Sequence, residues 1–361
     1  MSLTAELASA ARKYYKALWK RRSRAREAAF LESLRTGLGD LQPDSAESAQ
    51  YIQSAQAKLS LEQILELAQG LAYIRPLTPY AGWRFDADWN NPDLAYRLRR
   101  AIWERFNSDA LGHELVVDWY LDMQLCIRMG NDLSKQIFIG GCNEPNEMAF
   151  LAKELKPGMT LVDAGAMEGI YTVLGARVVG ANGKVYAFEP SRRERASLAR
   201  NLELNRLQHV QVFEAALSDA DGEGMLCVAN DEHSGQNTLG GLVFDGAREV
   251  ERIPVKLRRL DTVAAAEGWT RLDFLKMDVE GAEMRLLRGA EETLSRFHPV
   301  ILFEISERLL EKQGANPEQL IRWLTERDYL LYRFGSDGAL EPAADGMGDN
   351  MVAAPKHGSL R

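Results

Sequence analysis

The chain has 361 residues, of which 46% are hydrophobic and 27% charged, and its formal net charge is −8. This composition is typical of a globular protein, and the negative charge argues against binding nucleic acid through its phosphates. No apolar run approaches the roughly 20 residues that span a bilayer, and the N-terminus lacks the apolar core of a signal peptide. The cysteines, Cys126, Cys142 and Cys227, form no C-x-x-C pair, so we expect a cytoplasmic protein without a disulfide framework or a zinc site.

Residues 1–70 are expected to form a helical N-terminal extension, because residues 3–69 are rich in Ala, Leu, Glu, Gln and Arg. Between Arg12 and Arg26 the chain has eight basic residues and no acidic one, with aromatic residues interleaved. A helix of this kind can lie on an anionic membrane, bind a partner or mediate self-association through residues 3–69. We favour a helix that packs its aromatic stripe on the main body and leaves its charges in water.

Residues 71–143 are expected to form an aromatic-rich segment that precedes the main domain. Prolines and aromatic residues gather over 72–92, a pattern that indicates an ordered loop. Aromatic faces there can stack on sugar rings, although such clusters more often anchor a loop. A helix is predicted over 94–106, followed by strands over 114–129 and 136–139 that would pair as a hairpin.

Residues 144–361 alternate between helical and strand-like segments, which predicts βαβ units and a mostly parallel, doubly wound α/β sheet. The expected strands are 160–163, 184–188, 209–213, 273–277, 299–304 and 329–334, with turn-rich strands across 223–257 and a last apolar stretch at 351–354. The expected helices are 146–155, 169–179, 191–206, 281–295 and 317–327, and residues 335–349 are expected to form a loop. Ligands bind such sheets outside the carboxyl ends of the strands.

The first strand of this domain runs into Asp163, and a turn with Gly165, Ala166 and Gly169 follows before the next helix. Glycines allow a ligand to approach the backbone, and a helix N-terminus offers free N–H groups to an anion. A carboxylate at the position of Asp163 would repel a pyrophosphate but suits the amino group of a methionine-like ligand. We therefore predict that these four residues bind S-adenosylmethionine.

Two further strand ends complete a nucleotide-type site. Glu189 closes the second strand, where a carboxylate can accept hydrogen bonds from both ribose hydroxyls of an adenosine. Ala216 follows the third strand, where a small side chain would leave room for an adenine ring and a backbone N–H could bond a ring nitrogen. The neighbouring pair Ser218 and Asp219 can equally serve only as a turn or cap.

The strand 273–277 is followed by Asp278 and Glu280, which would face the meeting point of a methyl donor and its acceptor. Asp278 is predicted to bind the cofactor and to act as the general base, with His233 as a second candidate base that can also be a solvated loop residue. Glu280 can instead stabilise the positive end of the next helix. Carboxylates at 278, 280 and 304 could hold Mg²⁺, but their spacing does not demand it, so no metal is expected.

The run from Asp163 to Gly169, the Phe188-Glu189-Pro190 strand end, residues 216–219 and above all residues 276–283 resemble the FkbM family of S-adenosylmethionine-dependent methyltransferases. The resemblance covers about residues 130–355, including 131–134 and 350–353. It implies a Rossmann-like class I methyltransferase fold with helices on both faces of the sheet, and methylation of hydroxyl groups on sugars, glycans or secondary metabolites. Met167 departs from the pattern, since similar sequences usually carry Asn there.

Two other functions fit parts of the sequence. A nicotinamide-dependent oxidoreductase shares the fold class and the ribose carboxylate, but it predicts glycine at the position of Asp163. A non-catalytic interaction module of the same fold predicts a degraded cofactor site, and Met167 alone points that way. The acceptor is not specified by the sequence, because the N-terminal extension and the insert near 220–257 would shape its pocket.

Overall fold

The structure is a computed structural model, and it describes residues 29–30, 32–34, 36–37, 45–71, 94–108, 113–335, 338–343 and 348–357. The basic segment from Arg12 to Arg26 and the aromatic cluster within 72–92 lie outside the described residues. None of the helices that the structure describes is long and apolar enough to span a bilayer.

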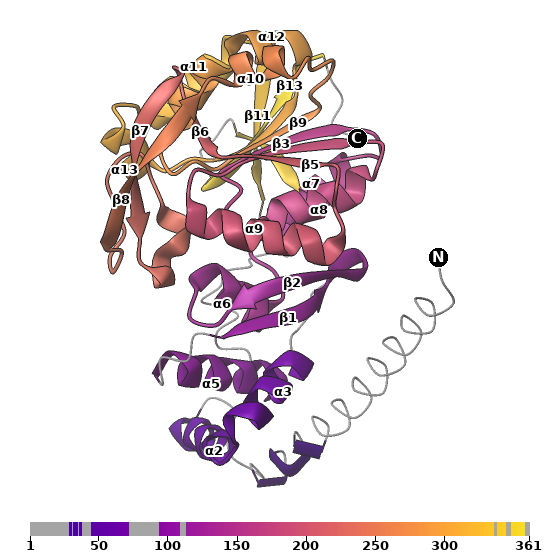
Figure 1. The fold of residues 1–361 in the computed structure, drawn as a ribbon, viewed down its shortest axis with the longest axis vertical. Coiled ribbons are helices and arrows are strands. Elements are labelled where there is room, and N and C mark those ends of the chain that lie inside the picture. The colour runs from indigo at the N-terminus through magenta and orange to yellow at the C-terminus, as the bar shows by residue number, and fades with distance from the viewer. Residues whose placement is uncertain are drawn as a thin grey trace, which may run out of the picture.

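An eight-stranded sheet forms the centre of the main domain, in the order β12-β11-β13-β10-β9-β3-β4-β5 (Figure 1). Its parallel strands are β3 (Thr160–Ala164), β4 (Lys184–Phe188), β5 (Val210–Phe213), β9 (Phe274–Met277) and β10 (Val300–Glu304). Strand β13 (Asn350–Pro355) runs antiparallel between β10 and β11 (Tyr329–Phe334), and β12 (Leu340–Pro342) pairs antiparallel at the edge. The mostly parallel order of this sheet confirms the predicted doubly wound α/β fold.

Helices cover both faces of this sheet because neighbouring residues of each strand point to opposite sides. Leu161 packs in one apolar cluster and Val162 in the other, and both side chains are fully buried. One face carries α7 (Pro145–Glu154), α8 (Ile170–Val179) and α9 (Arg192–Asn205). The opposite face carries α10 (Leu260–Ala266), α11 (Glu283–Gly289), α12 (Glu291–Phe297), α13 (Glu307–Lys312) and α14 (Pro317–Thr325).

A second, three-stranded sheet follows β5 and lies to one side of the central sheet (Figure 1). It consists of β6 (Ala215–Leu217), β7 (Gly222–Ala229) and β8 (Glu249–Arg258), in the order β6-β8-β7. The short 3₁₀ helix η2 (Asp231–Gln236) lies between β7 and β8. Strands β7 and β8 are the turn-rich strands expected across 223–257.

The N-terminal elements stack below the main domain in Figure 1. They are α2 (Ala46–Ala57), α3 (Leu61–Leu71), α5 (Leu94–Ser108), the hairpin of β1 (Glu114–Trp119) and β2 (Met123–Arg128) with η1 (Tyr120–Asp122) at its tip, and α6 (Asp132–Gly140). Helix α9 ties the hairpin to the main domain. The side chains of Asn201 and Asn205, one helical turn apart, accept hydrogen bonds from the backbone N–H groups of Cys126 and Gln124 at 2.7 and 2.8 Å.

Four local expectations were wrong. Residues 136–139 form part of α6 instead of a strand, because Asn131 caps that helix by accepting from the Ser134 N–H. The helix expected over 281–295 is two helices, α11 and α12, separated at Ala290. Helices α10 and α13 were not expected, and β12 lies within the expected loop 335–349.

Candidate active site

A cleft of about 540 Å³, including the part open to solvent, lies at the carboxyl ends of β3, β4 and β9. It brings together predicted site residues from four separate segments of the chain. The residues that line it are Gly165, Met167, Phe188, Glu189, Pro190, Ala216, Leu217, Leu226, Ser234, Gly235, Asn237, Leu239, Asp278, Val279, Glu280 and Ala282. The structure therefore places Gly165, Glu189, Ala216 and Asp278 on one cleft, whereas Asp163, Ala166, Gly169 and His233 do not line it.

The turn between β3 and α8 needs its two glycines. Gly165 has φ +78°, and a Cβ there would lie 1.7 Å from the carbonyl oxygen of Asp278. Gly169 has φ +86°, and a Cβ there would lie 2.3 Å from Leu198 Cδ1. The backbone N–H of Ala166 donates to Phe188 O at 3.0 Å. Gly165 therefore lets two strand ends touch beneath the cleft, and Gly169 and Ala166 fix the turn.

Asp163 lies fully buried beneath this turn. Thr172 Oγ1 donates to its Oδ2, and Lys276 Nζ lies 3.9 Å from its Oδ1, an oxygen without a hydrogen-bond partner among the described residues. Burial raises the pKa of Asp163, while the ammonium of Lys276 opposes that shift. Direct contact with a ligand's amino group, as predicted from the sequence, would need a path past the residues that line the cleft.

Glu189 reaches the cleft from the end of β4. Its Oε1 accepts from the Ser191 N–H at 2.8 Å and its Oε2 from the Met167 N–H at 2.9 Å. Burial, followed by the nearby carboxylate of Glu194, raises the pKa of Glu189 to about 7. Each carboxylate oxygen can accept a second hydrogen bond, so the group can still receive the two hydroxyls of a ribose.

Met167 holds Glu189 through its backbone, not through its thioether. The residue has φ +48°, the left-handed conformation in which Asn is favoured over most other residues. This conformation gives a backbone reason for Asn at this position in similar sequences. The departure at Met167 therefore leaves the hydrogen bond to Glu189 in place.

The wall beyond Glu189 is apolar and flat. The rings of Phe188 and Phe213 stack with centroids 4.6 Å apart, and Ala216 and Leu226 complete this side of the cleft. Ser218 and Asp219 do not line the cleft; Ser218 Oγ donates to Asp219, which pairs with Arg285 at 3.3 Å. An aromatic ring of a ligand fits against such a surface, with Ala216 leaving space for it.

Lys276 connects the residues at the floor of the cleft. Its buried ammonium lies 3.0 Å from Asp278 Oδ2 and 3.4 Å from Gly165 O, above the ring of Tyr171. Burial lowers the pKa of this ammonium, but the carboxylates of Asp278, Asp163 and Glu144 together raise it above its usual value. Lys276 is thus a charged anchor that orients Asp278.

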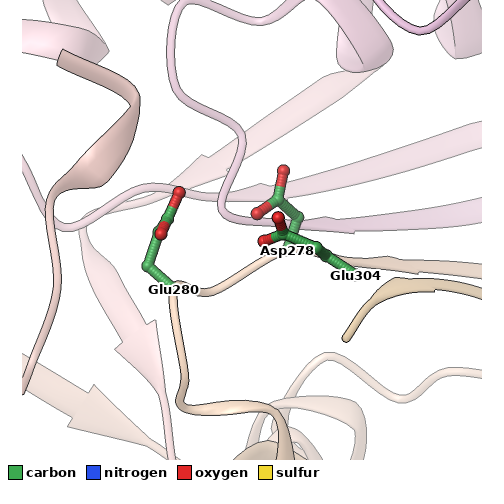
Figure 2. Close-up of side chains that lie close together, drawn as sticks. All are labelled: Asp278, Glu280 and Glu304. Carbon is green, nitrogen blue, oxygen red and sulfur yellow. The ribbon is translucent and has the colours of Figure 1, made fainter. Parts of the chain in front are cut away.

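Three carboxylates gather on one side of Asp278's loop, as Figure 2 shows. Oxygens of Asp278, Glu280 and Glu304 all lie within 4.8 Å of one another. Burial and the charge of Asp278 raise the pKa of Glu280, and the same two causes raise the pKa of Glu304 to about 9. Glu283 has a different function: its Oε1 accepts from the N–H groups of Val279 and Gly281, as expected for an acid at the start of a helix.

His233 lies in η2, beside the cleft-lining residues Ser234 and Gly235. It is not among the residues that line the cleft, and a Cβ added at Gly246 would lie 3.0 Å from its Nε2. The imidazole therefore has no place on the cleft wall. Its role as a base stays a prediction, with Asp278 better placed.

Sequence reasoning missed Glu144, which caps the N-terminus of α7 with φ +38°. Tyr171 Oη donates to its Oε2 at 2.7 Å and Asn350 Nδ2 donates to its Oε1 at 2.9 Å. Burial and the charge of Asp278 raise the pKa of Glu144. Asn350 lies in the stretch 350–353 that carries part of the family resemblance, whereas neither Glu144 nor Tyr171 lies in such a stretch.

The family model of the methyltransferase FkbM domain matches residues 163–331. Methyltransferase sdnD of Sordaria araneosa is 31% identical over 187 residues, which cover 44% of this chain and 69% of that protein. The chain belongs to the FkbM methyltransferase family. The 2-O-methyltransferase NoeI of Sinorhizobium fredii is 26% identical over 54% of this chain and 84% of its own length.

Two other similarities are more limited. The AMB antimetabolite synthetase AmbE of Pseudomonas aeruginosa is 31% identical over 184 residues, which are 41% of this chain but 8% of the synthetase. The crystal structure of methyltransferase FkbM from Methylobacillus flagellatus KT matches 61% of this chain and 52% of its own length, at 16% identity and a TM-score of 0.34. Because this TM-score is low, the assignment of the fold class rests on the strand order of the present chain.

Proposed function

We propose that this protein transfers a methyl group from S-adenosylmethionine to a hydroxyl group of a sugar, a glycan or a secondary metabolite. The observation that carries the proposal is the convergence of the Gly165 turn, Glu189 and Asp278 on one cleft at the carboxyl edge of the sheet. In doubly wound sheets this edge is where ligands bind. Membership of the FkbM family supports the same reaction.

The residues present fit the cofactor. Glu189 keeps two free acceptor positions for the ribose, the wall at Phe188 and Ala216 suits a flat ring, and the Gly165 backbone is open to close approach. When bound, S-adenosylmethionine supplies a methyl group on a positively charged sulfur. The carboxylate of Asp278, on the cleft wall, is the acidic group that could lie near this charge.

Asp278 is the proposed general base. It lines the cleft at the end of β9, and Lys276 fixes one of its oxygens while leaving the other available. The carboxylate takes the proton of the acceptor hydroxyl as that oxygen forms its bond to the methyl carbon and the carbon–sulfur bond breaks. General-base catalysis typically contributes about 10²–10⁴-fold, and the remaining rate depends on holding the two reactants in line.

The insert between β7 and β8 is proposed to select the acceptor. Ser234, Gly235, Asn237 and Leu239 from this segment line the same cleft, and every lining residue lies between 165 and 282. NoeI is named a 2-O-methyltransferase, which supports oxygen as the methylated atom.

The segments 1–70 and 71–143 are proposed to be separate units that precede the catalytic domain 144–361. The proposed location is the cytoplasm, where Cys126, Cys142 and Cys227 would stay unpaired.

The direct test is turnover. Purified full-length protein is incubated with S-adenosylmethionine labelled in its methyl group and with glycans or lipids from cells that lack the protein. We expect label in an acceptor, and loss of transfer in Asp278→Ala. Transfer that persists in Asp278→Ala would assign the base to another residue.

Two alternatives make different predictions. A nicotinamide-dependent oxidoreductase would bind NADH, and we expect no saturable change in NADH fluorescence on titration with this protein. A non-catalytic module would have a degraded cofactor site and bind a partner through its N-terminal segment. A truncation lacking residues 1–69 would then lose that partner, while its cofactor binding would equal that of the full-length protein.

A further inference from the structure

The carboxylates of Asp278, Glu280 and Glu304 come from two neighbouring parallel strands. Asp278 directly follows β9, Glu304 ends β10, and the two strands pair Met277 with Phe303. Their carboxyl ends therefore meet at one edge, and Glu280 returns to the same place from the loop after β9 (Figure 2). This arrangement puts three oxygen donors within 4.8 Å of one another.

Glu280 supplies an observation beyond the clustering of acids. Its Oε2 is buried and has no hydrogen-bond partner among the described residues, while the residue as a whole is half-buried. A buried acceptor left without a partner costs about 1–3 kcal/mol, and more when it is charged. A bound cation or hydrogen-bond donor at this oxygen would remove that cost.

The backbone of Glu280 is fixed in the orientation that produces this situation. Thr238 Oγ1 and Gln313 Nε2 both donate to its carbonyl oxygen, at 2.7 and 3.2 Å. The next residue, Gly281, has φ +97°, and a Cβ there would lie 2.5 Å from Leu309 O. The side chain is thus held toward Asp278 by contacts on both sides of the loop.

The local charge is only partly compensated, by the ammonium of Lys276. Lys276 pairs with Asp278 and Asp163, and in the described part of the chain no ion pair joins Glu280 or Glu304 to a basic residue. Three carboxylates with oxygen as their only donor atom match hard divalent cations, which bind oxygen at about 2.0–2.6 Å. Donors in this spacing need only small side-chain rotations to surround such an ion.

We propose that Asp278, Glu280 and Glu304 bind a divalent cation of the Mg²⁺ or Ca²⁺ type beside the methyl-transfer cleft. Asp278 and Glu280 line the cleft, so the ion has open positions on the cleft side. Building on the proposed function, those positions hold two adjacent oxygens of the acceptor and orient one of them toward the methyl group. The two oxygens of Asp278 have about four acceptor positions, enough for Lys276, the ion and the proton of the acceptor. The favoured acceptor is therefore a vicinal diol, as in a sugar ring, and not a compound with an isolated hydroxyl.

The test uses Mn²⁺ as the probe, because its paramagnetism reports free and bound ion directly. Full-length protein without added cofactor is titrated with Mn²⁺ and followed by electron paramagnetic resonance. We expect one saturable ion per chain, displaced by Mg²⁺ or Ca²⁺ but not by Na⁺ at equal ionic strength. Glu280→Gln and Glu304→Gln keep the shape of the side chain, and each should weaken binding about tenfold or more.

Glu307→Gln is the matched control, since Glu307 is an exposed acid three residues beyond Glu304, and it should leave Mn²⁺ binding unchanged. Circular dichroism verifies that each variant is folded. Absence of saturable binding in the wild-type protein, or equal affinity in the wild type and both cluster variants, overturns the proposal. Binding of S-adenosylhomocysteine, measured in the same samples, separates this outcome from failure of the proposed methyl transfer.

Discussion

Replacing Gly165 by alanine tests whether the close contact beneath the cleft positions the site. The substitution has two physical costs. The left-handed backbone at φ +78° disfavours any side chain, by roughly 1–2 kcal/mol. In addition, the new Cβ would lie 1.7 Å from the carbonyl oxygen of Asp278, so the two strand ends must separate by about 1.5 Å.

Gly158 offers a matched control for the first cost alone. It has φ +85°, and a Cβ there would meet no atom within 4 Å. Gly158→Ala should therefore lose about 1 kcal/mol of unfolding free energy, because lower entropy of the unfolded chain offsets part of the strain. Gly165→Ala adds overpacking, which typically costs about 1–3 kcal/mol more.

The effect on binding follows from the displacement. The Asp278 N–H donates to Ala164 O at 3.1 Å, so movement of this loop breaks the junction of β3 and β9 and shifts the Asp278 side chain. A displacement near 1 Å can reduce catalysis by about 100-fold. Urea unfolding measures the free energy, and calorimetric titration with S-adenosylhomocysteine measures the affinity.

We expect Gly158→Ala to keep wild-type affinity and Gly165→Ala to bind about tenfold more weakly or worse. If the two alanine variants show the same stability and the same affinity, the contact with Asp278 does not position the site, and the reasoning is refuted.

Three further predictions follow from single residues. Burial raises the pKa of Glu189 to about 7, and ribose hydroxyls favour its ionised form, so affinity for S-adenosylhomocysteine should fall as the pH drops through about 7. Calorimetry should show no such pH dependence in Glu189→Gln. If the affinity of this variant still falls, another group causes the pH dependence. Met167→Asn should raise the midpoint of thermal unfolding, because Asn tolerates φ +48° better than Met; a lower midpoint would contradict this explanation. Burial raises the pKa of Glu168 from 4.5 to about 7, so the stability that its neutral form provides is complete below pH 4.5 and is lost as the pH rises through 7. The unfolding free energy, measured in urea at pH 5 and at pH 8, should differ less in Glu168→Gln than in the wild type. An equal difference in both proteins would refute the assignment.

The sheet and the cleft could be predicted because parallel βα units bring every strand's carboxyl end to one edge. Asp163 lies at the carboxyl end of β3, and Glu189 and Asp278 directly follow β4 and β9, so their positions near one another required no knowledge of side-chain packing. What local pattern could not provide was burial. Asp163 lies beneath the cleft and not on it. Thr172 donates a hydrogen bond to one of its carboxylate oxygens, and the ammonium of Lys276 lies near the other.

Contacts between segments that are far apart in the sequence could not be predicted either. Glu144 lies at the very start of the predicted domain, and its hydrogen bond with Asn350 spans most of the chain. The proximity of Glu280 to Glu304 depends on a left-handed loop residue, φ +51° at Glu280, which no spacing rule predicts. Residues 136–139 were assigned to a strand because a short apolar run carries no period, while the deciding signal was the cap at Asn131.

The central claim is that this cleft binds the adenosine and methionine parts of S-adenosylmethionine. Calorimetric titration of the full-length protein with S-adenosylhomocysteine tests it most directly. The account predicts saturable binding at one site per chain, weakened about tenfold or more by Glu189→Ala and by Asp163→Ala, with both variants folded by circular dichroism. No saturable binding by the wild-type protein, or unchanged affinity in both variants, would contradict it.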